Sequence, residues 1–391
     1  MASIEQVLTR GVKKIIERES LEKKLKSGKI LTIKHGVDPT TPDLHLGYAV
    51  VYRKLRQFQD LGHKVIFLIG DFTGRFGDPT GKSEEIRFMR EKKEVHKLAK
   101  NYIDQAVKIL DKKKMEVRYN GEWYDKMNAE DLLRLMSKFT NAQMTQRDMF
   151  QERIKKGLDI GLHEPVYPVL QGYDSVMLKS DLTVIGSDQE FNELQGRRAQ
   201  EMFGQEPQDL LIMPILTGTD GKNKMSQSLG NYIGITEEPD SQYGKIMSIP
   251  DKLLPAYFTL LTDLNFDPPA GGKENPRDAK MKLAYEIVKN YHSEKEAEKA
   301  QENFIKLFQK KEIPDDIQEI KVGTERDLGD ILLENKIIES KSEFRRLVDQ
   351  GAIDVNNETI KDVYYKIEKS LVVKIGKKKF LKIIFYSSSK F

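Results

Sequence analysis

Short apolar runs alternate with amphipathic segments along the first half of the chain. Four of these runs have the length of a buried strand and cover residues 30–33, 64–69, 181–185 and 210–216. Residues 45–61 have the apolar spacing of a helix, which ends at Gly62. Strands followed by helices predict an α/β fold: a Rossmann-like, doubly wound parallel sheet with helices on both faces.

Glycine and aspartate follow each predicted strand. The four clusters lie at residues 35–38, 70–71, 186–189 and 218–221. In open α/β sheets, ligands bind in the crevice outside the carboxyl ends of the strands. We therefore expect the four clusters to meet around one binding site.

The N-terminal residues read as an amphipathic helix, with Val7, Leu8, Val12, Ile15 and Ile16 on one side. A mostly helical insertion covers about residues 83–161. Its apolar face includes Leu135 and Trp123 and requires cover, either from the body of the protein or from a partner subunit.

The pattern divides the chain into four parts. We predict a catalytic domain over residues 1–222, a helical domain over 223–311, a linker over 312–325 and a small α+β domain over 326–391. In the last part, helices are predicted over 328–333 and 341–349, and strands over 353–355 and 371–375.

Composition limits the chemistry. A hydrophobic content of 38% and a charged content of 32% are typical of a soluble globular protein. The chain has no cysteine, which excludes thiolate catalysis and cysteine-bound zinc. The longest apolar runs are strand-length, so we expect no membrane span and a cytoplasmic location.

Positive charge is concentrated at the end of the chain. From Arg326 to Phe391 there are 14 basic and 10 acidic residues, which account for the whole net charge of +4. A basic module after a neutral body indicates a polyanionic partner such as RNA, although a general bias toward lysine gives the same excess.

Two short strings suggest halves of one ATP site. The first runs from Asp43 to Tyr48 and places Gly47 at a helix start, where free N–H groups attract phosphate. The second runs from Lys224 to Ser228 between flanking glycines, which allow the loop to move. Each string alone fits an ordinary helix start or surface loop. Together, on this βα background, they predict adenylation of a carboxylate.

A third loop follows the strand at residues 64–69. Its Lys82, and Arg87 beyond it, are candidate phosphate contacts. They also fit solvated charges at the start of a helix.

These residues resemble a bacterial tyrosyl-tRNA synthetase, a class I aminoacyl-tRNA synthetase. The first string is similar to the HIGH signature of the family and the second to its KMSKS signature. The strings at 36–40, 77–81, 167–174 and 186–189 also have the family pattern, in the family order. The tail is similar to a small RNA-binding fold shared with a ribosomal protein.

The resemblance implies a tyrosine pocket. Tyr167, Gln171 and Asp174 are spaced so that one helix face presents all three. Asp174 would accept the phenolic hydroxyl, while Asp78, Tyr167 and Gln171 would hold the ammonium. The implied tyrosine-binding residues are Lys34, Gly36, Asp78, Tyr167, Gln171, Asp174 and Gln189.

The resemblance also implies an ATP site, with Mg²⁺ carried by the nucleotide and no metal held by the protein. The implied catalytic residues are His45, Lys224, Lys82 and Thr40. The implied ATP-binding residues are Asp38, Leu46, Gly47, Tyr48, Gly186, Asp188, Met225, Ser226, Gln227 and Ser228. In the tail, the candidate RNA contacts are Arg345, Arg346, Lys377, Lys378, Lys379 and Lys382.

Three positions depart from the commonest family pattern. Tyr48 replaces the second histidine of HIGH, and Gln227 replaces the second lysine of KMSKS. Lys34 stands where one branch of the family has a tyrosine, so this chain looks like the other branch. Because Gln227 removes a positive charge from the loop, we expect slower adenylation than the family norm.

The implied function is that of a tyrosine–tRNA ligase that acts on L-tyrosine and tRNA(Tyr), as a homodimer. The implied reaction needs placement and charge stabilisation, but no protein nucleophile. Two alternatives stay open: a tryptophan ligase of the same fold, and a degenerate paralogue that binds RNA without catalysis.

Overall fold

The computed structural model describes residues 2–78, 90–266, 275–308, 318–356, 358–376 and 379–385. The chain divides into two compact units, residues 1–301 and 302–391. Within the described residues, no helix is long and apolar enough to span a bilayer.

A six-stranded sheet forms the centre of the first unit, in the order β1-β6-β5-β2-β3-β4. The strands are β1 (Lys14–Ile16), β2 (Thr32–Val37), β3 (Lys64–Ile69), β4 (Met115–Tyr119), β5 (Leu182–Gly186) and β6 (Asp209–Met213). All neighbouring pairs are parallel except β1 with β6. The doubly wound sheet is therefore confirmed.

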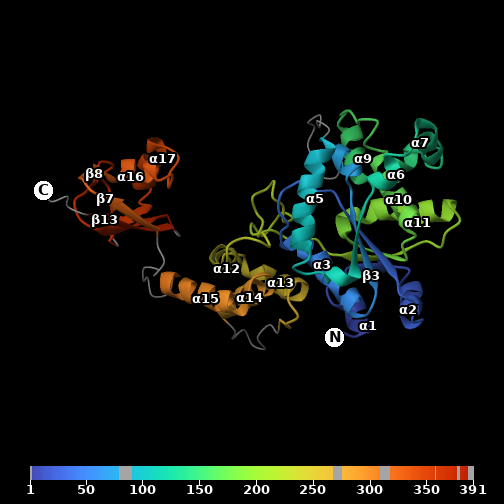
Figure 1. Ribbon diagram of the computed structural model, residues 1–391, viewed down its shortest axis with the longest axis horizontal. Helices are drawn as coiled ribbons and strands as arrows, with labels where there is room; N and C mark the ends of the chain where they lie inside the picture. Colours follow the sequence, from blue (N-terminus) through green and yellow to red (C-terminus); the bar gives the residue numbers. More distant parts are fainter. Residues whose placement is uncertain are drawn as a thin grey trace. The chain divides into compact units, whose positions relative to one another are not determined.

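Helices cover both faces of this sheet (Figure 1). On one face lie α3 (Leu46–Asp60) and α5 (Lys92–Ala106), and on the other lie α10 (Tyr167–Leu178) and α11 (Glu190–Met202). The second face buries Ile66 and Leu68 of β3 against Leu170 and Ala199. This packing fixes α10 beside the carboxyl ends of the strands.

Two strands differ from the prediction. Residues 14–16 form β1 instead of continuing the N-terminal helix, which is limited to α1 (Ile4–Thr9) and followed by α2 (Arg18–Lys26). The reason is that β1 pairs with the distant β6, which local periodicity does not reveal. Within the predicted helical insertion, β4 extends the sheet beside β3.

The remainder of the insertion is helical and packs largely on its own body. The short helix α4 (Thr73–Phe76) comes just before the insertion. Besides α5 and β4, the elements of the insertion are η1 (Lys112–Lys114), α6 (Gly121–Tyr124), α7 (Ala129–Met136), α8 (Asn141–Met144) and α9 (Asp148–Lys155). Trp123 and Leu135 are buried in the core beside α10, whereas Leu133 is 64% exposed.

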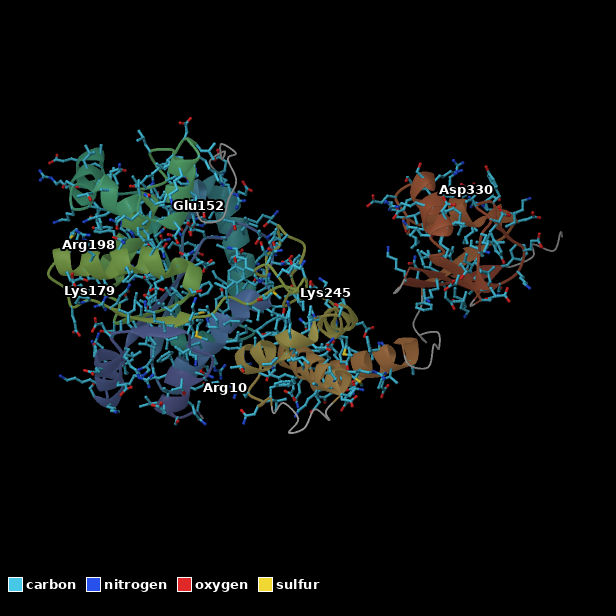
Figure 2. The ribbon with its side chains drawn as sticks, turned by 180° about the vertical axis from the view of Figure 1, so that it is seen from behind. Arg10, Glu152, Lys179, Arg198, Lys245 and Asp330 are labelled. Carbon is cyan, nitrogen blue, oxygen red and sulfur yellow. The ribbon has the colours of Figure 1, made fainter. Side chains whose placement is uncertain are left out.

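Helices follow the last strand of the sheet, as predicted. They are α12 (Pro239–Met247), η3 (Asp251–Leu253), α13 (Leu254–Leu261), α14 (Pro276–Tyr291) and α15 (Glu294–Phe308), whereas η2 (Ser187–Gln189) lies earlier, between β5 and α11. Lys245 of α12, labelled in Figure 2, pairs with Glu237 at 2.5 Å and donates to the carbonyl of Tyr232. These contacts tie α12 to the segment that follows the Lys224 loop.

The second unit contains a five-stranded sheet in the order β10-β9-β12-β13-β7. Its elements are β7 (Gln318–Val322), β8 (Arg326–Asp327), α16 (Leu328–Glu334), α17 (Lys341–Asp349), β9 (Ile353–Val355), β10 (Glu358–Thr359), β11 (Lys366–Ile367), β12 (Leu371–Ile375) and β13 (Lys379–Phe385). Strand β7 pairs in parallel with β13, so residues 318–322 belong to the sheet instead of the linker that we expected.

Candidate active site

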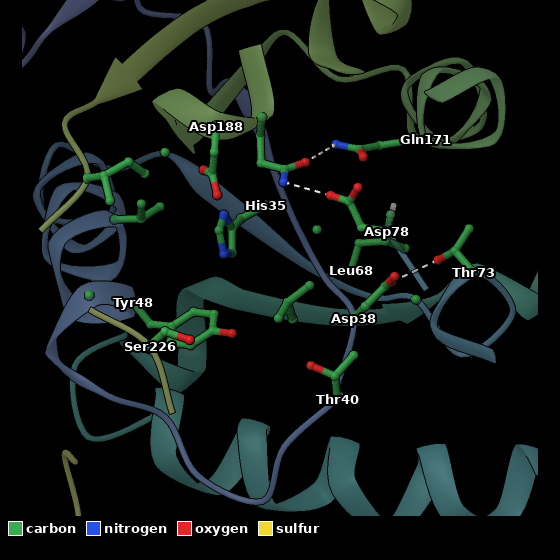
Figure 3. A pocket seen from close by; sticks show the side chains of 18 of the residues that line it. His35, Asp38, Thr40, Tyr48, Leu68, Thr73, Asp78, Gln171, Asp188 and Ser226 are labelled. Atoms are coloured by element: carbon green, nitrogen blue, oxygen red, sulfur yellow. Dashed lines mark hydrogen bonds between the residues drawn. The ribbon is translucent and has the colours of Figure 1, made fainter. Parts of the chain in front are cut away.

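One cavity of about 330 Å³ opens at the carboxyl ends of the parallel strands (Figure 3). Groups that follow β2, β3 and β5 line it, as the strand-end pattern predicted. After β6, however, the wall is made by Pro214, Ile215 and Leu216 instead of residues 218–221. The strand stops at Met213, earlier than expected, so the chain reaches the cavity before the glycine cluster.

The carboxylate of Asp174 lines this cavity, and the residue is only 3% exposed. The indole nitrogen of Trp123 donates to its Oδ1 at 3.0 Å, and the amide of Asn120 donates to Oδ2 at 3.4 Å. Burial raises the pKa of Asp174 to about 7, against the opposing charge of Lys34. Asp174 is thus a buried, oriented hydrogen-bond acceptor on the wall of the cavity.

Asp38 connects three elements beside the same cavity. The hydroxyl of Thr73 donates to its Oδ1 at 2.9 Å (Figure 3). The phenol of Tyr167 donates to its Oδ2 at 2.8 Å. Burial and the nearby carboxylate raise the pKa of Tyr167 well above its usual value. Tyr167 is therefore neutral, and its oxygen keeps acceptor capacity toward the cavity.

Amide and carboxylate groups gather on the next part of the wall. Gln189 donates to Asp78 at 2.9 Å, and the amide of Gln171 approaches Gln189 at 3.5 Å (Figure 3). Arg147 lies 3.4 Å from the other oxygen of Asp78. The structure thus brings together three of the predicted ammonium contacts, Asp78, Tyr167 and Gln171.

His45 begins helix α3 at the other end of the cavity. Its Nδ1 accepts from the backbone N–H of Gly47 at 3.1 Å. Burial and the charge of Lys224 lower the pKa of His45 to about 4, so the ring is neutral at pH 7. Because Nδ1 accepts, the ring proton is on Nε2, which can donate to an oxygen of a ligand.

Gly47 is required by the close approach of this ring. A Cβ atom at Gly47 would lie 2.8 Å from the His45 imidazole. The glycine therefore leaves both the ring and the first turn of α3 accessible. The free N–H groups at this helix start suit an anionic ligand.

Lys224 begins the second signature string, and its charge acts on His45. Its ammonium lies 3.7 Å from Asp188, and its side chain is 47% exposed. Met225 and Ser226 line the cavity after it. The charge of Lys224 is thus available at the mouth of the site, near the neutral imidazole.

Backbone hydrogen bonds join the first signature string to residues 233–235, which follow the second string. The N–H of Leu46 donates to Ile233 at 2.9 Å, and the N–H of Ile235 donates to Leu44 at 3.0 Å. In addition, Gln227 donates to the carbonyl of Asp43 at 2.7 Å. The segments around His45 and Lys224 therefore form one connected wall.

Most of the predicted small-molecule residues line the cavity, but four of those that the structure describes do not. Leu46 is buried behind it, Lys34 is buried in an ion pair, Gln227 bonds to Asp43, and Ser228 bonds to Ser226. Lys82 lies outside the described residues. The predicted residues on the wall are Gly36, Asp38, Thr40, His45, Gly47, Tyr48, Asp78, Tyr167, Gln171, Asp174, Gly186, Asp188, Gln189, Lys224, Met225 and Ser226.

Several wall residues were missed. His35 projects into the cavity, with its Nδ1 3.0 Å from the carbonyl of Val184 (Figure 3). Burial lowers its pKa to about 4. Asn120 follows β4, and it was missed because we read that strand as part of a helical insertion. His35 is the first residue of the strand-end cluster at residues 35–38, so its position was the available signal.

The candidate RNA contacts lie in the second unit. Arg345 and Arg346 are exposed on α17, and Lys379 is exposed at the start of β13. Lys382 pairs with Glu319 at 2.7 Å. Lys377 and Lys378 lie outside the described residues. Among the residues described, no cluster of three or more histidine or carboxylate side chains has the arrangement of a metal site.

Two family models match the chain. The model of the class I tRNA synthetases (W and Y) matches residues 26–309, and that of the tyrosine–tRNA ligase SYY-like C-terminal domain matches residues 309–383. The chain belongs to the class I tRNA synthetases of the tryptophan and tyrosine group.

Curated relatives narrow this class. The tyrosine–tRNA ligase of Thermotoga maritima is 49% identical over 387 residues, which cover 97% of this chain and 96% of the relative. The tyrosine–tRNA ligase of Carboxydothermus hydrogenoformans is 48% identical, with 97% of both chains covered. Within its class, the chain therefore falls in the tyrosine–tRNA ligase family.

Solved structures support the fold. A tyrosyl-tRNA synthetase from Archaeoglobus fulgidus, complexed with L-tyrosine, has a TM-score of 0.61 at 21% identity. The match covers 76% of this chain and 98% of that one. A truncated mitochondrial tyrosyl-tRNA synthetase from Aspergillus nidulans has a TM-score of 0.64 at 23% identity and covers 78% and 93%.

Proposed function

We propose that this chain activates L-tyrosine with Mg-ATP and then transfers tyrosine to the 3′ end of tRNA(Tyr). One observation carries the proposal: a single cavity is lined at one end by Asp174 and at the other by His45, Gly47 and Lys224. An acceptor for a phenol and a cradle for phosphates thus share one site.

The phenol end supplies the selectivity for tyrosine. Trp123 and Asn120 fix the carboxylate of Asp174, which accepts the substrate hydroxyl. Phenylalanine would leave unfilled the acceptor position of this carboxylate that the substrate hydroxyl occupies, and an unsatisfied buried acceptor is costly. Tyrosyl-tRNA synthetases are themselves the standard instance of such discrimination.

The middle of the cavity holds the backbone of the amino acid. Asp78, Gln171 and Tyr167 present acceptor oxygens, which suit an ammonium. Gln189, bonded to Asp78, orients that carboxylate. The substrate carboxylate is then directed toward the nucleotide end.

The nucleotide end holds ATP and stabilises the leaving pyrophosphate. The N-terminus of α3 at Gly47 receives phosphate, and Asp188 accepts from a ribose hydroxyl. The Nε2–H of His45 and the ammonium of Lys224 donate to phosphate oxygens as negative charge develops. Interactions that strengthen in the transition state lower the barrier.

The reaction then follows from placement. The tyrosine carboxylate attacks the α-phosphorus in line and expels pyrophosphate, which leaves with the Mg²⁺ that ATP carries. The terminal ribose hydroxyl of tRNA next attacks the mixed anhydride and releases AMP. No side chain forms a covalent bond in either step.

Amino-acid-dependent exchange between ATP and pyrophosphate tests the activity. We expect exchange with tyrosine and essentially none with phenylalanine or tryptophan. Exchange with tryptophan alone would favour the tryptophan ligase. RNA binding without any exchange would favour the non-catalytic paralogue.

The partners follow from the same assignment. The basic second unit, with Arg345, Arg346 and Lys379 exposed, is proposed to bind tRNA through phosphate contacts, and the protein to act in the cytoplasm. Leu133 and Leu162, 64% and 92% exposed, are proposed to lie in a homodimer interface. Sedimentation analysis, in which Leu162→Glu should shift the protein toward monomers, tests the dimer.

A further inference from the structure

A buried ion pair lies directly behind the amino-acid end of the cavity. The ammonium of Lys34 on β2 is 2.8 Å from Oε2 of Glu193 on α11, and the two side chains are only 1% and 2% exposed. Burying two charges costs desolvation energy that their attraction often fails to offset. A gain in stability is therefore a poor explanation for this pair.

Glu193 touches the wall of the cavity through Gln171. Its Oε1 accepts from the amide nitrogen of Gln171 at 2.7 Å. Its Oε2 accepts from Lys34 and, at 2.9 Å, from Gln208. Both carboxylate oxygens are thus occupied by donors, and one of those donors belongs to a cavity residue.

The carboxylate of Glu193 determines the orientation of the Gln171 amide group. An ionised carboxylate only accepts, so it selects the NH₂ end of the amide. The amide oxygen accepts from Asn192 at 2.8 Å and retains a second lone pair. A flipped amide would instead offer N–H donors, which repel an ammonium.

We propose that Glu193 is a positioning residue that fixes the amide of Gln171 with its oxygen available to the ammonium of the amino-acid substrate, and that Lys34 is the counter-ion of Glu193. This inference rests on the proposed function, in which Gln171 binds that ammonium. Lys34 also donates, at 2.7 Å, to the hydroxyl of Ser175, which is the residue after Asp174. Its contribution is therefore made from behind the wall and not by contact with the phenol.

Lys34 has a specific part in this arrangement. Its ammonium lies 2.8 Å from the carboxylate of Glu193 and supplies the opposite charge in a buried site. A buried charge without an ionic partner is costly. Lys34 thus allows the carboxylate to stay in the protein interior next to Gln171.

Two ligands separate positioning from folding. L-tyrosine carries the ammonium, and 3-(4-hydroxyphenyl)propanoate has the same phenol and carboxylate without it. The readout is the ratio of the two Kd values, measured by calorimetry on the full-length chain. Only a change at the ammonium contact alters this ratio.

The test variant is Lys34→Met combined with Glu193→Leu, which removes both charges together and leaves neither unpaired. We expect the preference for tyrosine to fall about tenfold, with the KM for ATP unchanged. Lys34→Gln combined with Glu193→Gln keeps polar side chains but removes the carboxylate, and should reduce the preference at least threefold. This second variant decides the question if the first fails to fold.

A control removes a second ion pair, in which only the aspartate is fully buried. Lys24 and Asp209 lie 3.1 Å apart, away from the cavity wall. Lys24→Met with Asp209→Asn should leave the ratio unchanged, as should the conservative Lys34→Arg. The inference is overturned if the two Glu193 variants bind both ligands more weakly by the same factor, so that the ratio of the two Kd values is unchanged. If the wild-type chain shows no preference for tyrosine, the proposed function itself fails.

Discussion

The indole nitrogen of Trp123 donates to the carboxylate of Asp174 across 3.0 Å. The two residues come from α6 in the insertion and from α10, so the insertion helps to build the cavity instead of only covering the body. Because this donor favours the ionised carboxylate, it opposes the effect of burial on the pKa of Asp174.

Tyrosine binding is expected to weaken as pH falls through 7. The pKa of Asp174 is raised to about 7, so the carboxylate is present above that pH and is lost below it. The phenol then loses its strongest acceptor, and the Kd for tyrosine should rise about fivefold from pH 7 to pH 6. Fluorescence titration over pH 5.5–8.5, a range set by that pKa of about 7, measures this.

Phenylalanine serves as the control for this titration. It cannot pair with the carboxylate, so protonation of Asp174 should ease its binding slightly. The discrimination between the two amino acids should therefore narrow at low pH. A Kd for tyrosine that is flat across this range would show that Asp174 does not titrate there.

Trp123→Phe removes the indole donor while keeping an aromatic ring. The carboxylate of Asp174 then loses a hydrogen bond that is worth about 1.5–3 kcal/mol for a charged acceptor. We expect the pH midpoint of tyrosine binding to move upward and the KM for tyrosine at pH 7 to rise about tenfold. An unmoved midpoint would contradict this account of the donor.

Lys224→Ala should lower the rate of adenylate formation about 10²–10³-fold, which is the usual effect of removing one donor to a developing charge. The Kd for tyrosine should stay the same, since Lys224 lies at the nucleotide end. Single-turnover fluorescence measures both. Lys222→Ala, an exposed lysine in the same loop, is the matched control and should leave the rate unchanged.

Gln227→Lys restores a positive charge to the loop. We expect faster pyrophosphate exchange, by several-fold, because the new ammonium adds to the charge of Lys224 in the transition state. The substitution also removes the hydrogen bond to Asp43, so Gln227→Met separates the two effects. If the lysine variant is no faster than wild type, another group already supplies that charge.

Removal of residues 309–391 should leave tyrosine-dependent exchange intact and reduce tRNA charging at least tenfold. A cut at Arg326 would leave β7 without its partner β13, so the earlier boundary is the sounder one. Aminoacylation of tRNA(Tyr) at two salt concentrations measures the loss. Full charging by the shortened chain would remove the second unit from RNA binding.

The sequence predicted those elements that carry a local signal. Strand β3 and helix α17 have the predicted bounds, because apolar runs and caps mark them. Strand β7 was missed because its alternation is short and charged, and its pairing with β13 is distant in the chain. Strand β1 has the same non-local origin.

More of the residues that line the cavity were predicted than of the residues that hold those side chains in place. Asp174 and Gln171 were predicted from the family resemblance, and their spacing on one helix face agrees with it. Trp123 and Glu193 hold these side chains from other elements, and only tertiary packing brings them there. Lys34 was assigned to the substrate because family resemblance gives a position but not the direction of a side chain.

The backbone hydrogen bonds between the His45 segment and residues 233–235 have a consequence for local unfolding. The N–H of Leu46 donates to the carbonyl of Ile233, and the N–H of Ile235 donates to the carbonyl of Leu44, so opening of either segment breaks both bonds. These two amides should therefore exchange with deuterium as one cooperative unit. The first turn of α3 would then lose its order together with the segment that follows the Lys224 loop.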